Sequence, residues 1–224
     1  MLTLISSFDH SLQHWINEVA ISPFLDHLMA AMTSFSAWRP IFILVIVGAL
    51  IFGKFRMRVM LLCLALALGV TDGLVVRNLK HLVMRPRPFQ AQAGIRQVHL
   101  VPASPQLTTM ITTPQVSFSE APREDAAFKA KELSFPSAHA ANVVTCATVL
   151  CLFYRRWRWL YITIALTVIY SRLYTGVHWP SDVLAGACIG IVVGTAVVRL
   201  ANRAWKAWGG TIAPALAKRH PSLL

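Results

Sequence analysis

The chain has 224 residues, of which 56% are hydrophobic and only 13% are charged. This composition excludes an ordinary soluble domain and predicts one compact membrane domain over residues 1–224. The formal net charge of +12 does not indicate a nucleic-acid-binding protein, because the cations stand in short strips beside hydrophobic runs.

Three strips of cations indicate how the chain is oriented in a membrane. The strips are Lys54, Arg56 and Arg58, then Arg155, Arg156 and Arg158, and last Arg199, Arg203, Lys206, Lys218 and Arg219. They hold 11 of the 21 Lys and Arg residues and none of the nine Asp and Glu residues. Because cytoplasmic segments of membrane proteins are rich in Lys and Arg, we expect these strips in the cytoplasm. The other connecting segments then lie at the outer face of the cytoplasmic (inner) membrane.

Residues 1–38 contain no Lys or Arg, so they lack the basic start of a secretory signal peptide and we expect no cleaved signal. Their apolar residues recur at helical spacing, which predicts an amphipathic helix lying on the membrane surface. Residues 23–53 are expected to form one helix, or a helix pair broken near Pro40. They could cross the membrane once or twice, and the absence of cations before Arg39 favours one crossing with the N-terminus outside.

The second span is predicted at residues 57–83, and it carries Lys80 to the outer face. Asp72 lies within this apolar run, where an ionisable group is costly unless it is paired. A buried hydrogen bond to a neighbouring helix or to Arg77 is the favoured interpretation. A role in a site near Lys80 is the alternative.

Residues 89–134 differ from the rest of the chain, because they are mostly polar or small and include four prolines. We expect an extramembrane loop insertion, since loops of this length are commonly lids, binding elements or disordered segments. The insertion joins Arg87 to Ser137, so it either shapes the substrate site or is merely tolerated there.

Two further spans are predicted at residues 137–154 and 159–173. A last helix begins at about Trp179, because Pro180 suits the first turn of a helix. Three glycines at four-residue steps indicate close packing of this helix against another: Gly186, Gly190 and Gly194. Residues 209–224 are expected to be a poorly ordered cytoplasmic tail. The predicted fold is an all-α, polytopic membrane helix bundle with five or six spans and an N-terminal interfacial helix.

The sparse polar chemistry of the chain is concentrated in residues 171–182, between two hydrophobic runs. His178 stands just before the last helix, and Asp182 in the first turn of that helix can reach back to an imidazole nitrogen. Such an imidazole is either a general base or, with its other nitrogen free, a nucleophile. Arg172 adds a fixed charge with forked donors that suit a phosphate oxygen.

Two other stretches supply partners for this one. Lys80 and Arg87 are seven residues apart, which puts them two turns apart on one face of a helix. Arg85 is left as a lipid-headgroup contact or a residue behind the pocket. Ser137 and His139 stand at the start of a predicted span, where backbone N–H groups can hold an anion. The three stretches together describe a phosphate pocket with two acid–base groups. The cysteines show no metal-type spacing, and we expect neither a metal nor another cofactor.

These residues give the chain a family resemblance. Lys80 with Arg87-Pro88, then Pro136-Ser137-Ala138-His139, then Ser171-Arg172 with His178 and Asp182 resemble, in order and spacing, the three-part signature of the type 2 phosphatidic acid phosphatase family. One departure is Ala138, where many members have glycine, and both residues are small.

The resemblance implies a metal-independent integral membrane phosphatase that acts on a lipid phosphate or pyrophosphate. His178 would attack phosphorus, oriented by Asp182, and form a phosphohistidine. His139 would protonate the leaving oxygen and then activate water. The phosphoryl group would be bound by Lys80, Arg87, Ser137, Ala138 and Arg172. Substrates of related bacterial proteins include undecaprenyl pyrophosphate, phosphatidylglycerophosphate, phosphatidic acid and lipid A, and the signature does not choose among them.

Three alternatives stay open at this point. A lipid phosphotransferase would use the same phosphohistidine with a lipid acceptor in place of water. A vanadate-dependent haloperoxidase shares the anion pocket, but members with that activity are soluble. A non-enzymatic membrane scaffold or transporter is the alternative from another class, and the complete set of motif residues argues against it.

Overall fold

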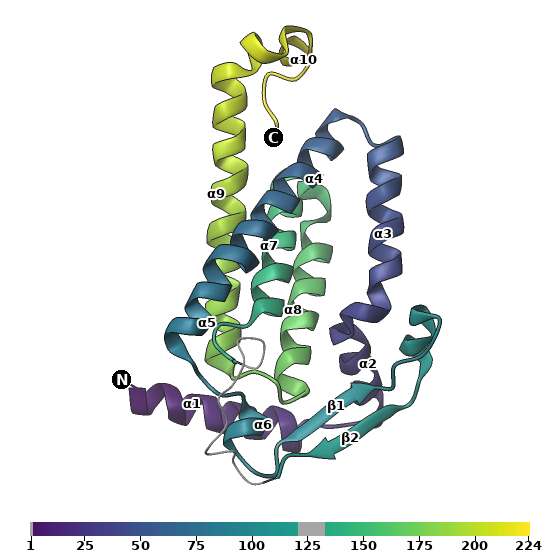
Figure 1. The fold of residues 1–224 in the computed structure, drawn as a ribbon, viewed down its shortest axis with the longest axis vertical. Helices are drawn as coiled ribbons and strands as arrows, with labels where there is room; N and C mark the ends of the chain where they lie inside the picture. Colours follow the sequence, from purple (N-terminus) through teal and green to yellow (C-terminus); the bar gives the residue numbers. More distant parts are fainter. Residues whose placement is uncertain (1, 121–132) are drawn as a thin grey trace.

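The computed structural model describes residues 2–120 and 133–224, which form a bundle of helices with a small hairpin at one end (Figure 1). The main helices are α3 (Phe35–Phe52), α4 (Phe55–Leu68), α5 (Arg77–Val83), α7 (Ala138–Phe153), α8 (Arg158–Tyr174) and α9 (Pro180–Ile212). A π-helical segment, η2 (Gly69–Val76), joins α4 to α5. This mostly helical architecture confirms the predicted fold class, and the predicted bounds of the three central spans agree with α4–α5, α7 and α8 to within two residues.

Three helical stretches of the described chain are long and apolar enough to cross a membrane: residues 35–52, 55–91 and 180–212. α7 is a shorter apolar helix. The side chains of α3 are apolar and yet largely exposed, with Leu44 at 73% and Phe52 at 86% exposure. A continuous exposed apolar surface of this kind is typical of a helix that faces lipid.

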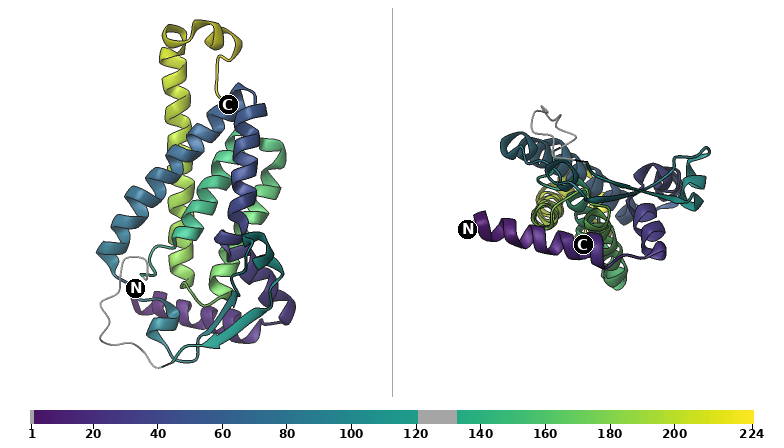
Figure 2. Two further views of the ribbon diagram at one scale, coloured as in Figure 1. Left: turned by 45° about the vertical axis from the view of Figure 1, so that its right-hand side comes forward. Right: turned by 90° about the horizontal axis from the view of Figure 1, so that it is seen from below.

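The N-terminal segment forms helical pieces at the lower end of the bundle: α1 (Leu2–His14), η1 (Trp15–Val19) and α2 (Pro23–Thr33). Figure 1 and Figure 2 show α1 lying across the bundle and not along it, which is the arrangement predicted for an interfacial helix. Asn17, buried in η1, donates to the carbonyl oxygens of Arg96 (2.7 Å) and Tyr174 (2.9 Å). The segment is therefore fastened to the bundle as well as suited to the membrane surface.

The break between α2 and α3 falls at Ser34, so the break predicted near Pro40 is wrong. The carbonyl oxygen of Ser34 accepts the N–H groups of Ala37 and Trp38 and starts α3 anew. Pro40 lies in the second turn of α3, where its missing N–H removes one hydrogen bond close to the helix start. With 11 residues, α2 is too short for a crossing, which takes about 20 residues. Within residues 23–53, α3 alone has nearly that length.

Glycines bring α7 and α9 into close contact. A Cβ atom on Gly186 would lie 2.6 Å from the carbonyl oxygen of Ser137, and one on Gly190 would lie 2.6 Å from that of Ala141. Larger residues would therefore push the two helices apart. The N–H of Ser137 also donates to the carbonyl oxygen of Asp182 at 3.0 Å. This packing fixes the start of α7 beside the start of α9, where two of the predicted site stretches lie.

Residues 89–120 are folded, whereas the sequence predicted a loop throughout residues 89–134. After α6 (Pro88–Ala91) come β1 (Arg96–Leu100), the 3₁₀ helix η3 (Gln106–Ile111) and β2 (Pro114–Phe118). The two strands form an antiparallel hairpin. The remainder of the predicted insertion, residues 121–132, lies outside the described residues.

The hairpin is attached to the bundle at several points. Val98 and Leu100 are buried in the same apolar cluster as the end of α8. Arg96 is paired with Asp26 of α2 at 2.5 Å. Gly176, in the loop between α8 and α9, has φ of +69° and would place a Cβ atom 2.5 Å from the carbonyl oxygen of Arg96. Only glycine fits this conformation and this approach together, so β1 rests directly on the loop that carries His178.

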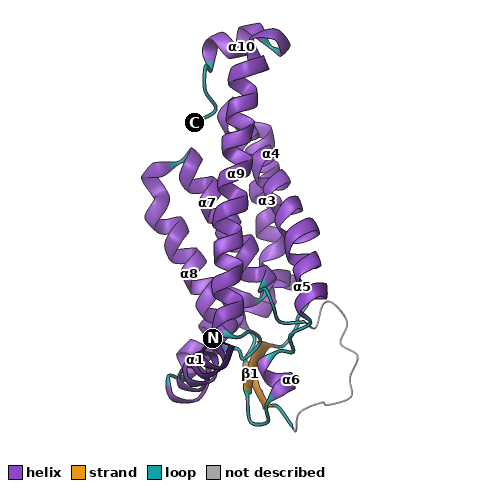
Figure 3. Cartoon of the chain, turned by 90° about the vertical axis from the view of Figure 1, so that its left-hand side faces the viewer, coloured by secondary structure: helices purple, strands orange, loops and turns teal. Residues whose placement is uncertain are grey.

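The cation strips lie at the other end of the bundle. They fall on the α3–α4 turn, on η5 (Arg155–Trp157) with the start of α8, and on the second half of α9 with α10 (Pro214–Arg219). Figure 1 and Figure 3 show these elements away from α1 and the hairpin. The charge separation noted in the sequence is therefore a separation between the two ends of the fold.

The tail predicted to be poorly ordered is folded, and that prediction is wrong. Trp205 of α9 donates its Nε1–H to the carbonyl oxygen of His220 at 2.7 Å. The ring of Phe55 packs on the rings of Trp205 and His220, with centroids 5.3 and 4.8 Å apart. The sequence of residues 209–224 did not indicate these contacts, because Phe55 and Trp205, which His220 meets, lie outside the tail.

Candidate active site

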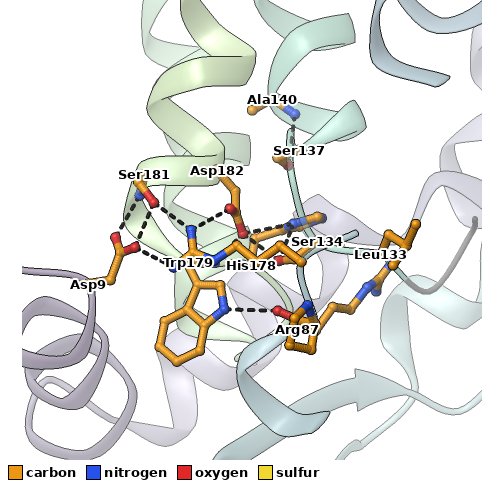
Figure 4. Close-up of polar contacts among 12 residues, drawn as sticks. Asp9, Arg87, Leu133, Ser134, Ser137, Ala140, His178, Trp179, Ser181 and Asp182 are labelled. Carbon is orange, nitrogen blue, oxygen red and sulfur yellow. Dashed lines mark hydrogen bonds and ion pairs between the residues drawn. The ribbon is translucent and has the colours of Figure 1, made fainter. Parts of the chain in front are cut away.

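The three predicted stretches meet at the end of the bundle that carries α1 and the hairpin (Figure 4). The predicted site residues are Lys80 from α5, Arg87 at the start of α6, Ser137, Ala138 and His139 at the start of α7, Arg172 at the end of α8, His178 just before α9, and Asp182 in its first turn. Those that are at most 8% exposed are Lys80, Ser137, Arg172, His178 and Asp182. The fold therefore gathers residues from distant parts of the sequence into one buried polar cluster.

Ser134 lies between the imidazole of His178 and the carboxylate of Asp182 (Figure 4). Its Oγ donates to Oδ2 of Asp182 and lies 3.4 Å from Nδ1 of His178. The direct separation of His178 Nδ1 and Asp182 Oδ2 is 3.8 Å, which is too long for a hydrogen bond. The sequence predicted a direct contact, and the structure links the two residues through a serine hydroxyl that the sequence did not single out.

Both oxygens of the Asp182 carboxylate are held in place. Oδ2 also accepts the backbone N–H of Trp179 at 2.9 Å, so Asp182 caps the first turn of α9. Oδ1 accepts a hydrogen bond from the guanidinium of Arg85 at 2.8 Å. Of the two interpretations left open for Arg85, this contact favours a residue behind the pocket over a headgroup contact.

The pKa of His178 is held well below its ordinary value, first by burial and then by the charges of Arg172, Arg87 and Lys80. The side chain is 2% exposed, so little water can stabilise a charged imidazole. His178 is therefore neutral at neutral pH, with Nδ1 turned toward Ser134 and Nε2 on the opposite side of the ring. A neutral imidazole in this setting can act as a nucleophile.

Two of the cations contact neighbouring protein groups. Lys80 donates to the carbonyl oxygen of Leu133, and Nη1 of Arg172 donates to Oγ1 of Thr33. Nε of Arg172 is buried and has no hydrogen-bond partner among the described residues. Charged donors buried beside a neutral imidazole are suited to the oxygen atoms of a phosphate.

Ser137 caps α7 at the positive end of the helix. Its Oγ accepts the N–H of Ala140 at 3.5 Å. The first N–H groups of a helix have no partner within it, so the start of α7, at Ala138 and His139, is suited to hold an anion. His139 is half-buried, and the charge of Arg172 acts on it as it does on His178. The residues predicted to bind phosphate and the two histidines thus share one electrostatic environment.

Asp72, which the sequence singled out beside Lys80, is the next residue to place. Asp72 is exposed on η2, so the buried hydrogen bond favoured from the sequence is wrong. Asp72 makes none of the contacts described above, but its charge acts on Lys80, so a role near Lys80 stays a prediction. Within residues 2–120 and 133–224, no group of three His, Cys, Asp or Glu side chains could hold a metal ion.

The chain is similar in sequence to known families and proteins. A family model described as the PAP2 superfamily matches residues 58–206. The lipid A 4'-phosphatase of Bacteroides thetaiotaomicron is 31% identical over 196 residues, which cover 85% of this chain and 75% of that protein. The undecaprenyl-diphosphatase of Sulfolobus acidocaldarius is 48% identical over 63 residues, which cover 28% of this chain and 31% of that protein.

Two solved structures are similar in fold. The crystal structure of Aquifex aeolicus LpxE matches with a TM-score of 0.54 and 26% identity, over 85% of this chain and 94% of that one. The crystal structure of the first transmembrane PAP2 type phosphatidylglycerolphosphate phosphatase from Bacillus subtilis matches with a TM-score of 0.55 and 24% identity, over 88% of this chain and 86% of that one. Both likenesses agree with a membrane helix bundle.

Proposed function

The chain belongs to the PAP2 superfamily, and on that premise we propose that it hydrolyses a lipid phosphate or diphosphate through a phosphohistidine at the outer face of the cytoplasmic membrane. The observation that carries the mechanism is the placement of His178, whose imidazole is 2% exposed and has Nδ1 turned toward Ser134. The charges of Arg172, Arg87 and Lys80 act on this imidazole. The relatives named as lipid phosphatases support the substrate class. The cations supply the positive charge that the transferring phosphoryl group needs, so the proposed reaction is metal-independent.

The first step is attack by Nε2 of His178 on phosphorus. The phosphorus–nitrogen bond forms while the bond from phosphorus to the leaving oxygen breaks. His139, which takes up a proton once the negative charge of the bound phosphate offsets the neighbouring cations, gives that proton to the leaving oxygen. Nδ1–H of His178 faces the Oγ of Ser134, which in turn donates to Asp182. This chain of hydrogen bonds stabilises the positive charge that develops on the ring.

The second step hydrolyses the phosphohistidine. A water molecule gives a proton to His139 and attacks phosphorus, the phosphorus–nitrogen bond breaks, and inorganic phosphate leaves. Throughout, the phosphoryl oxygens are bound by Lys80, Arg87, Ser137, the N–H of Ala138, and Arg172. For phosphate to bind, the contacts that Lys80 and Arg172 make with Leu133 and Thr33 are exchanged for contacts with phosphate oxygens.

We place the site at the outer face of the membrane because of where the cation strips lie. The cation strips are at the end of the bundle opposite the site, and strips of this kind mark the cytoplasmic side. The test uses a chain whose own cysteines are replaced by serine. A single cysteine is then introduced by Ser104→Cys in the hairpin or by Ala215→Cys in α10. We expect an impermeant reagent to label these two cysteines from opposite sides of the membrane. Labelling of both from one side would contradict this orientation.

The substrate proposed first is a lipid A type phosphate monoester, because the similarity to the lipid A 4'-phosphatase extends over 85% of the chain. Undecaprenyl diphosphate is the second candidate, since its relative matches more closely but over only 63 residues. The test is release of inorganic phosphate by purified protein from lipid A, undecaprenyl diphosphate, phosphatidylglycerophosphate and phosphatidic acid, with water as the only acceptor. We expect the highest kcat/KM with lipid A.

The other outcomes of this assay have separate meanings. Release of phosphate from undecaprenyl diphosphate alone would identify the chain as a diphosphatase and replace lipid A as the proposed substrate. Appearance of phosphorylated lipid only after a lipid acceptor is added would identify a phosphotransferase. No phosphate release from any of the four lipids, with or without an acceptor, would overturn the enzymatic proposal.

A further inference from the structure

Asp9 of α1 is completely buried, although it lies on the helix that crosses the lower end of the bundle. Its Oδ1 accepts a hydrogen bond from the backbone N–H of Ser181 at 2.8 Å, and its Oδ2 accepts one from the hydroxyl of the same serine at 2.6 Å. Oδ2 also accepts a hydrogen bond from Nη2 of Arg85 at 2.6 Å. Figure 4 shows the Asp9 carboxylate directed at Ser181, at the start of α9.

Arg85 connects this carboxylate to the candidate site. Its Nη2 binds Asp9, while its Nη1 donates to Oδ1 of Asp182 at 2.8 Å and to the Oγ of Ser181 at 2.7 Å. The guanidinium lies over the ring of Trp179, 5.2 Å from its centroid. Because the guanidinium is planar and rigid, its orientation is set from both ends, and a change at Asp9 is transmitted to Asp182.

Stability alone is a weak reason for this arrangement. A buried ion pair contributes little net stability, because the loss of solvation offsets much of the attraction between the charges. The first turn of α9 already has a cap in Asp182, which accepts the N–H of Trp179. Arg85 adds a hydrogen bond to Oδ1 of Asp182, and Oδ2 of the same carboxylate accepts a hydrogen bond from Ser134. Asp9 in turn accepts a hydrogen bond from the other terminal nitrogen of Arg85.

We propose that Asp9 and Arg85 are positioning residues, which hold the Asp182 carboxylate with Oδ2 toward Ser134 and His178 through a buried ion bridge from the N-terminal helix. The inference rests on the proposed function, since it assigns a role in the same site. It makes α1 a part of the catalytic apparatus in addition to a membrane-surface helix.

The test is a double-mutant cycle on kcat and KM for the lipid phosphate that wild-type protein hydrolyses best. Asp9→Asn and Arg85→Gln are each expected to lower kcat by about ten- to a hundredfold, the range in which residues that orient active-site groups commonly act. KM should change by less than about threefold, because neither side chain binds the phosphate. In the Arg85→Gln background, Asp9→Asn should have almost no further effect on kcat, since its influence passes through Arg85.

Asp26→Asn is the matched control. Asp26 also forms an ion pair with an arginine at this end of the bundle, Arg96 at 2.5 Å, but it does not contact Asp182. We expect this variant to lower the melting temperature in detergent while kcat stays within about twofold of wild type, because it acts on folding and not on the site. If Asp9→Asn does not accumulate as folded protein, Arg85→Lys replaces it, since an ammonium keeps the charge but cannot bridge two carboxylates as a fork does. Its kcat is expected to fall as in Arg85→Gln.

Three results would overturn the inference. An unchanged kcat in Asp9→Asn, or in Arg85→Lys where that variant is used, would show that the bridge does not position Asp182. A full effect of Asp9→Asn in the Arg85→Gln background would show that Asp9 acts on α9 through Ser181 alone. A wild-type protein that hydrolyses no lipid phosphate would overturn the proposed function and this inference together, and so is distinguished from the first two results.

Discussion

The two ends of the bundle hold the same kinds of charged residue in opposite ways. At the site end, Arg172 and Asp182 are 8% and 0% exposed, and each is hydrogen-bonded to a distant segment of the chain. At the other end, Arg155 and Arg156 are exposed on a short turn. Burial of a charge is unfavourable unless specific partners offset it, whereas an exposed cation beside a span acts by being on that side of the membrane. Substitutions should therefore separate the two ends sharply.

The largest effect is expected for His178. His178→Ala removes the nitrogen that we propose as the nucleophile, so turnover and any acid-labile phosphoenzyme should be abolished. The measurements are phosphate release and trapping of labelled phosphoenzyme after an alkaline detergent quench, with loss of the label on later acid treatment as the sign of phosphohistidine. His99→Ala is the control, because His99 is an exposed histidine of β1 at the same end and should leave kcat unchanged. Turnover by the His178→Ala protein would refute the proposed nucleophile.

A smaller and substrate-dependent effect is expected for His139. A lipid alkoxide leaves only with a proton, whereas p-nitrophenolate leaves with little help. His139→Ala should therefore lower kcat/KM for a lipid monophosphate by about a hundred- to ten-thousandfold, the usual size of general acid–base help, and affect p-nitrophenyl phosphate much less. Equal losses on both substrates, with phosphoenzyme formation untouched, would assign the acid role to another residue.

The same contrast between the ends explains what the sequence could predict. Helix bounds such as those of α7 and α8 were predictable, because apolar runs and their polar ends are local features of the sequence. The residues that meet in the site were predictable because their spacing resembles a known signature. Their roles stay predictions, since the geometry brings them together without showing a reaction.

Three contacts near the site that the sequence missed join segments that are far apart in the chain. Ser134 and Asp182 are separated by 48 positions, Thr33 and Arg172 by 139, and Asp9 and Ser181 by 172. Ser134, Thr33 and Asp9 belong to no motif. A single serine, threonine or aspartate in a helix or loop is not distinctive by itself. The hairpin was missed for a similar reason, because strands of five residues between prolines and polar residues look like a loop until the bundle buries one face.

Acid should distinguish the site end from the rest of the fold. The unfolded chain protonates His178 near its ordinary pKa of about 6.5, whereas the folded protein holds that pKa well below this value. Below about pH 6.5 the unfolded state therefore binds a proton that the folded state does not, and the free energy of unfolding falls by up to about 1.4 kcal/mol per pH unit. This contribution is constant above that pH and is lost as the pH falls toward the lowered pKa.

The measurement is the melting temperature in detergent between about pH 5 and pH 8 for wild type and for His178→Ala. The substitution lowers stability at every pH by removing a buried ring, so the slope and not the absolute value carries the test. Wild type should lose stability more steeply below about pH 6.5 than the variant does. Parallel curves would mean that the folded protein protonates this imidazole as readily as the unfolded chain.

The smallest effect is expected at the end of the bundle that carries the cation strips. Arg155→Gln with Arg156→Gln removes two exposed charges and leaves nine of the 11 strip cations, so orientation in the membrane should be kept. Activity should stay within about twofold, and the free energy of unfolding within about 0.5 kcal/mol, as for other surface substitutions. Arg172→Gln makes the same chemical change in the buried cluster and should lower kcat/KM at least about a hundredfold, because a donor to the developing charge is lost. A comparable loss in the double variant would show that placement in the fold does not separate the two kinds of arginine.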